Sequence, residues 1–123
     1  MSQADELADR MHLFSVRVVG FCRTLPPTPE GFVVRRQLAK AGTGITANYR
    51  AARRARSHTE FTARMGVTSE EADEAFFWLR LIIDSRLMSG PEVQELRTEA
   101  QALSAICAAT YRTARASDRR HRC

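Results

Sequence analysis

The chain has 123 residues, the size of one ordinary domain, and 44% of them are hydrophobic, so it can bury a core without disulfides or metals. Its formal net charge is +5, and 18 of its 19 basic residues are arginine. No stretch approaches the roughly 18 apolar residues of a membrane span, and the polar N-terminus lacks the apolar core of a secretory signal. We therefore expect a cytoplasmic protein.

The first predicted helix carries one apolar stripe with the spacing of a helix packed in a bundle. The stripe consists of Leu7, Met11, Phe14, Val18, Phe21 and Leu25. Pro26, Pro27 and Pro29 then end this helix, because proline lacks the backbone N–H and restricts the residue before it.

The second helix is expected from about Gly31 to Arg54, with Val34, Leu38, Ala41, Ile45, Asn48 and Ala52 on its stripe. Gly42 and Gly44 each cost about 1 kcal/mol relative to alanine inside a helix. We interpret them as points of close helix approach and assign them to the subunit interface. We predict that Asn48, the polar residue of the stripe, is buried and bonds to backbone groups of a neighbouring helix, fixing the register.

Two further helices complete the pattern. Ser57 and Glu60 form a capping-box pattern that opens the third helix. The stripe of this helix consists of Phe61, Met65, Thr68, Ala72, Ala75, Leu79 and Ile82. A cap at Ser89, an early proline and an acid at Glu92 open the fourth. Its stripe consists of Val93, Leu96, Ala100, Leu103, Cys107, Thr110 and Ala114.

No strand pattern competes, and the linkers are short. The sequence therefore predicts an all-α, antiparallel up-down-up-down four-helix bundle. We expect a single bundle domain over residues 1–114. The basic segment 115–123 has no apolar stripe, and we expect it to be a disordered tail.

The segment QLAKAGTGITANYRAA, residues 37–52, resembles the second-helix motif of a bacterial four-helix-bundle family. The members of this family were first met as proteins encoded in intervening sequences of 23S ribosomal RNA genes. Gln37, Leu38, Lys40, Ala41, Ile45, Ala47 and Asn48 fall in register with the motif. Thr46 replaces the family's proline, and residues 50–52 replace its Ala-Glu-Gly ending with Arg-Ala-Ala.

The resemblance extends from about Leu7 to Ala114 and implies a cyclic homo-oligomer, typically a pentamer, with no known catalytic activity. One branch of the family, the accessory protein of diversity-generating retroelements, binds a reverse transcriptase and nucleic acid. The ribosomal-gene branch has no established role.

Catalytic and metal-binding patterns find little support. The three histidines lie on separate segments, and the odd number of cysteines (Cys22, Cys107 and Cys123) includes no CxxC pair. The acids between Glu70 and Glu74 are better explained as a solvated helix face than as a metal cluster. We therefore predict a non-enzymatic protein with no catalytic residue, metal or cofactor.

The third helix gives the best sequence argument for self-association. Eight of the nine residues from Ala75 to Ile83 are apolar, more than one core-facing stripe requires. A helix that is apolar all round is buried all round. We expect a second subunit to cover Phe76, Phe77, Trp78 and Leu81, although partial exposure at the edge of the core is the simpler alternative.

Basic residues concentrate at one end of the predicted bundle. Eleven arginines face five acids there, a net charge of +6, whereas the opposite end balances to zero. We predict contacts with RNA or DNA backbones, of little sequence preference, from Arg50, Arg53, Arg54, Arg56, Arg64, Arg112, Arg115, Arg119 and Arg120. Two alternatives stay open: a merely solvated surface, and a scaffold that contacts only protein and uses this end for an acidic partner.

Overall fold

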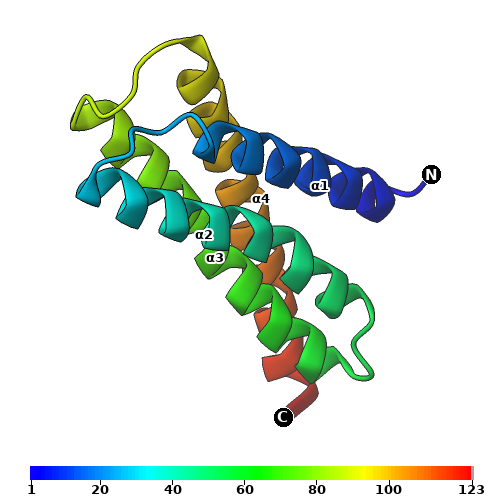
Figure 1. The fold of residues 1–123 in the computed structure, drawn as a ribbon. Helices are drawn as coiled ribbons and strands as arrows, with labels where there is room; N and C mark the ends of the chain where they lie inside the picture. The colour runs from blue at the N-terminus through cyan, green and yellow to red at the C-terminus, as the bar shows by residue number, and fades with distance from the viewer. Residues whose placement is uncertain (123) are drawn as a thin grey trace.

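Four helices follow one another along the chain in a computed structural model that describes the backbone of residues 1–122 and the side chains of residues 1–119. They are α1 (Gln3–Cys22), α2 (Pro29–Arg53), α3 (His58–Asp84) and α4 (Pro91–Arg122). Consecutive helices run antiparallel (Figure 1), and the described residues contain no strand. The prediction of an all-α four-helix bundle is confirmed.

Side chains cap the starts of α1 and α2. The Ser2 hydroxyl accepts a hydrogen bond from the Asp5 amide, and the Asp5 carboxylate accepts one from the Ser2 amide. The Thr28 hydroxyl caps α2 by accepting a hydrogen bond from the Gly31 amide, ahead of a proline at the first helical position. These caps begin both helices a few residues earlier than the apolar stripes alone predict.

The start of α3 follows the predicted capping residues with one difference. The Ser57 hydroxyl accepts from the Glu60 amide at 3.1 Å, as expected. The Glu60 carboxylate, however, accepts from the amide of Arg56, one residue before the cap. At α4, Gly90 with φ +117° directly precedes the helix, so the predicted cap at Ser89 lies one residue too early.

The predicted stripes form the core with few exceptions. Leu25 is buried but follows the end of α1. On α2, Tyr49 is buried where the stripe placed Asn48, which is only half-buried. Leu7, Phe61 and Thr110 are likewise only partly buried. The remaining stripe positions of all four helices are buried.

The helices do not pack equally closely. α3 lies between α2 and α4 and packs along both, whereas α1 packs mainly on α2 and meets α4 over a short stretch. Figure 1 shows α1 diverging from α4 toward the N-terminus. The first helix is therefore the least enclosed element of the bundle.

The last helix is longer than predicted. α4 continues to Arg122, so the prediction of a disordered tail from residue 115 is wrong for residues 115–122. Arg112, Arg115 and Arg119 are exposed, and Ala114 and Asp118 face inward. This spacing keeps one side of the extension against α3. Cys123 lies outside the described residues.

Candidate nucleic-acid interface

At one end of the bundle, the beginning of α1 lies beside the end of α2, and the last turns of α4 lie beside the beginning of α3. The Arg53 guanidinium lies 2.8 Å from the Asp5 carboxylate and so joins α2 to α1. His58 Nε2 lies 3.1 Å from the Ala114 carbonyl oxygen and 3.2 Å from the Asp118 carboxylate, which joins α3 to α4. The beginning of α1 and the end of α4 thus each lie next to the α2–α3 hairpin.

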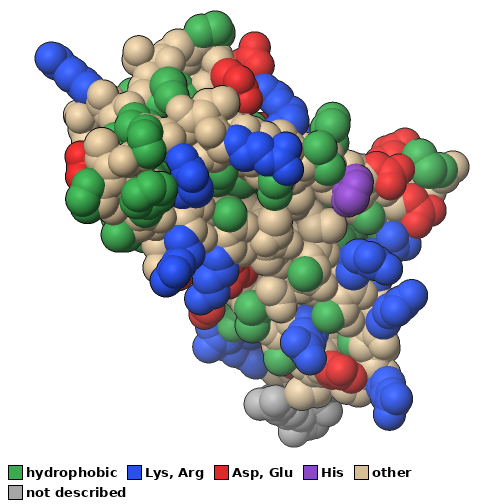
Figure 2. Space-filling model, in the orientation of Figure 1, with side chains coloured by type: hydrophobic (Ala, Val, Ile, Leu, Met, Phe, Trp, Pro, Cys, Tyr) green, Lys and Arg blue, Asp and Glu red, His purple; other side chains and the backbone are tan. Residues whose placement is uncertain are grey.

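Seven exposed arginines lie at this end, on α2, the α2–α3 turn, α3 and α4. They are Arg50, Arg54, Arg56, Arg64, Arg112, Arg115 and Arg119. Among the described side chains, none of these guanidinium groups forms an ion pair or a hydrogen bond. Figure 2 shows lysine and arginine side chains spread along this part of the surface with few acidic ones between them.

Four basic residues of the predicted end stand apart from this group. Arg53 is held by Asp5, and the hydrogen bonds from Arg53 and from Ser2 hold the pKa of Asp5 below its ordinary value. Arg10 forms a two-hydrogen-bond pair with Glu99 of α4, an acid that the charge count had assigned to neither end. The side chains of Arg120 and Arg122 lie outside the described residues.

The apolar segment of α3 is only partly exposed. Phe77 and Leu81 are 52% and 38% exposed. Phe76 and Trp78 pack against the core of their own chain, and the Phe77 ring meets the Trp78 ring edge-on at 4.9 Å. Of the four residues predicted for an interface, Phe77 and Leu81 are therefore exposed, whereas Phe76 and Trp78 pack against the core.

Gly42 and Gly44, predicted for a subunit interface, each face another helix of their own chain. A β-carbon on Gly42 would meet Val18 of α1, and one on Gly44 would meet the carboxylate of Glu71 on α3. Both glycines therefore permit close approach of helices within one chain. The Asn48 amide was predicted to bond to a neighbouring helix, but it donates to the Gly44 carbonyl oxygen of its own helix at 2.8 Å.

The sequence reasoning missed an exposed apolar face on α1 and the start of α2. Its members are Leu13, Val16, Val19, Phe32 and Val33, which are between 36% and 60% exposed. The sequence carries a signal for this face. Residues 11–16 and 18–22 of the first helix include no acid and no arginine, even at positions outside the core stripe.

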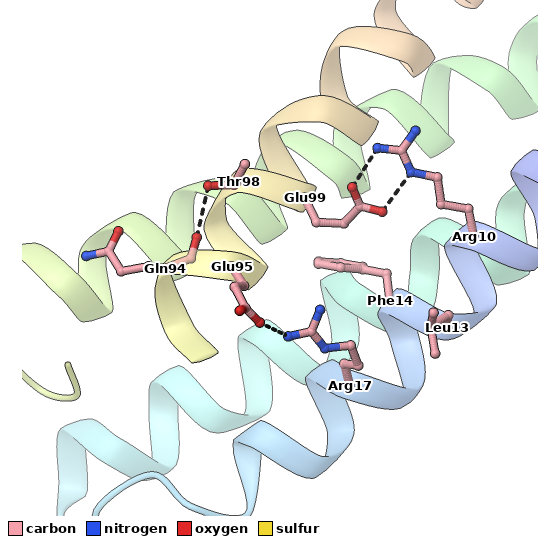
Figure 3. A pocket seen from close by; sticks show the side chains of 8 residues that line it. All are labelled: Arg10, Leu13, Phe14, Arg17, Gln94, Glu95, Thr98 and Glu99. Atoms are coloured by element: carbon pink, nitrogen blue, oxygen red, sulfur yellow. Dashed lines mark hydrogen bonds and ion pairs between the residues drawn. The ribbon is translucent and has the colours of Figure 1, made fainter. Parts of the chain in front are cut away.

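An open hollow of about 400 Å³ lies between α1 and α4. Figure 3 shows Phe14 pointing toward α4 between two ion pairs, Arg10–Glu99 and Arg17–Glu95, whose closest N–O distances are 2.6 and 2.9 Å. Each carboxylate in the hollow is thus neutralised by a guanidinium. The two ion pairs hold α1 against α4.

The described residues hold no group of three or more histidine, cysteine or acidic side chains able to bind a metal ion. None of their helices is long and apolar enough to cross a membrane.

The fold and this surface define an all-helical bundle with a cluster of exposed arginines at one end. A family model described as 23S rRNA-intervening sequence protein matches residues 5–109, and the chain belongs to that family. The resemblance seen in the sequence is thereby confirmed.

A solved structure supports the fold. It is the crystal structure of a protein with unknown function from the S23 ribosomal protein family of Bacteroides thetaiotaomicron. The two chains share 23% identity with a TM-score of 0.80, and the match covers 90% of this chain and 99% of that one. No curated protein matches the sequence.

Proposed function

We propose that this protein is a non-enzymatic homo-oligomer that binds the backbone of RNA or DNA through its arginine-rich end. One observation carries the proposal: seven exposed arginines lie on the α2–α3 turn, the helix ends beside it and the last turns of α4, and none has an acidic partner among the described side chains. Guanidinium groups bind phosphate oxygens in pairs of hydrogen bonds. Such contacts release counterions and need no particular base sequence.

Two further parts of the proposal rest on separate support. The non-enzymatic assignment is supported by the hollow between α1 and α4, where both carboxylates are paired with arginines. Assembly is supported by the exposed side chains of Phe77 and Leu81. Several copies in one ring, a pentamer by resemblance, would place their arginine-rich ends on one rim and multiply weak phosphate contacts.

A reverse transcriptase is a further proposed partner, on the resemblance to the retroelement accessory branch alone. A reverse-transcriptase gene beside this one, with template and variable repeats, is the genomic arrangement that this partner requires. Its absence from the gene neighbourhood would remove the retroelement assignment and leave nucleic-acid binding as a separate question.

A salt titration with labelled single-stranded RNA and duplex DNA tests the binding. We expect affinity to fall by roughly one log unit per log unit of salt for each phosphate contact. Arg54→Gln combined with Arg56→Gln should weaken binding to all sequences alike and reduce the salt slope. The matched control combines Arg80→Gln with Arg86→Gln, which removes the same charge from exposed positions elsewhere and should leave affinity nearly unchanged.

Absence of binding by the parent protein at low salt would contradict the proposal, as would equal losses in the two double variants. The second candidate, a scaffold that contacts only protein, would then be the better interpretation. The uncovered surface at Phe77 and Leu81 favours it, because exposed apolar patches mark protein-binding sites.

A further inference from the structure

Two separate apolar surfaces of the bundle remain uncovered. The first, the α1–α2 face, consists of Leu13, Val16, Val19, Phe32 and Val33. The second, the α3 face, consists of Val67, Glu70, Glu74, Phe77 and Leu81, which follow one another at helical spacing and are all exposed. Both surfaces stay exposed in the folded chain, so another molecule would have to cover them.

The α1–α2 face includes a hollow that suits an inserted side chain. An opening of about 470 Å³ runs between the two helices and is lined by Val16, Val19, Gly20 and Thr43 among others. No atom of another residue lies within 4 Å of the position that a β-carbon on Gly20 would take. The exposed phenyl ring of Phe77 is a side chain of suitable chemistry for such a hollow.

The charges around the two faces are opposite. No aspartate or glutamate occurs between Asp9 and Glu30, or between Glu30 and Glu60. The exposed charges near the α1–α2 face are mainly basic, because Arg23, Arg36 and Lys40 outnumber Glu30, and Glu95 beside Leu13 is paired with Arg17. The α3 face instead carries Glu70 and Glu74 between its apolar residues, with Asp73 beside them.

Each face would therefore repel a second copy of itself and attract the other face. We propose that the α1–α2 face of one copy packs on the α3 face of the next. A contact between two different surfaces of the same chain is heterologous, and repeating it closes a ring when the rotation allows. This inference rests on the proposed homo-oligomer and adds the two surfaces that meet.

The proposed contact leaves the arginine-rich end available. Arg54, Arg56, Arg112 and Arg115 belong to neither face, and all four are exposed. Assembly and nucleic-acid binding therefore use different residues, so that each can be disrupted separately.

A mixing experiment tests the pairing of the two faces. One variant combines Leu13→Glu with Val16→Glu, and the other combines Phe77→Glu with Leu81→Glu. By light scattering without nucleic acid, the parent should show the mass of several chains, whereas each variant alone should show the mass of one chain. An equimolar mixture retains one intact junction and should form a particle of two chains and nothing larger. Ala105→Glu, at an exposed position of α4, should keep the parent mass.

Several outcomes would overturn the inference. These are a parent mass of one chain, a parent-like mass in either double variant, a mixture that stays at one chain, or a mixture that exceeds two. Circular dichroism checks that the variants fold, and serine replacements at the same positions serve if a glutamate pair unfolds. Because mass is measured without nucleic acid, failure here is distinguishable from failure of nucleic-acid binding.

Discussion

A β-carbon added to Gly42 of α2 would lie 2.7 Å from a methyl carbon of Val18 on α1. Val18 is fully buried, and its branched side chain has little rotamer freedom in a helix. Close to this point, the Ser15 hydroxyl donates to the Gly42 carbonyl oxygen at 2.8 Å. The absence of a side chain at position 42 thus sets how near the two helices lie.

We expect Gly42→Ala to destabilise the protein by about 1–3 kcal/mol through overpacking, although alanine is the better helix former. Gly20→Ala is the matched control, because its β-carbon would meet nothing within 4 Å. That change should stabilise α1 by up to about 1 kcal/mol. Urea unfolding followed by circular dichroism measures both, and shifts of the same sign in the two variants would contradict this account.

Glu71 should weaken the fold at neutral pH. Burial, followed by the neighbouring Glu74 carboxylate, raises the pKa of Glu71 above its ordinary value of 4.5, and one of its oxygens is buried without a hydrogen-bond partner. The folded state therefore binds this proton more tightly than the unfolded chain, and stability is lost as pH rises from about 4.5 through the folded pKa.

We accordingly expect Glu71→Gln to raise the melting temperature at pH 7 and to have a smaller effect at pH 4. Melting curves between pH 4 and pH 8 compare the variant with its parent. A glutamine variant that melts lower than the parent at pH 7 would show that the charged carboxylate is stabilising.

The thiols of Cys22 and Cys107 should be unreactive in the folded protein. Both are buried, and burial raises the pKa of each thiol to about 11, so that very little reactive thiolate forms at neutral pH. In a Cys123→Ser background, we expect a thiol reagent at pH 7.5 to label them only as the protein unfolds. Complete labelling within seconds under native conditions would be inconsistent with the observed burial.

The ion pair between Arg10 and Glu99 should hold α1 against α4 in a salt-dependent manner. Because the Arg10 and Glu99 side chains are 44% and 25% exposed, we expect their coupling to be at most about 1 kcal/mol. A double-mutant cycle with Arg10→Gln and Glu99→Gln measures it, and amide exchange in α1 should quicken in each single variant. If the coupling is unchanged at high salt, the contact is not electrostatic.

The four helices could be predicted from the sequence because their causes are local. Apolar residues at helical spacing mark the stripes through Phe14, Leu38, Leu79 and Leu103, and all four side chains are buried as expected. Capping at Ser57 was visible for the same reason, since a hydroxyl reaches an amide only three residues away. The grouping of arginines at one end followed from these helices and their antiparallel order.

The tertiary structure decided which side chains face one another across helices. Arg10 could not be paired with Glu99 in advance, because they are 89 residues apart and meet only through the angle between α1 and α4. The same angle leaves Leu13 and Val16 exposed. Gly42 could be read as a site of close approach, but only the packing shows that Val18 of the same chain fills the space. Spacing along a chain specifies which residues share a helix face. Which helix that face meets depends on how all four helices pack together.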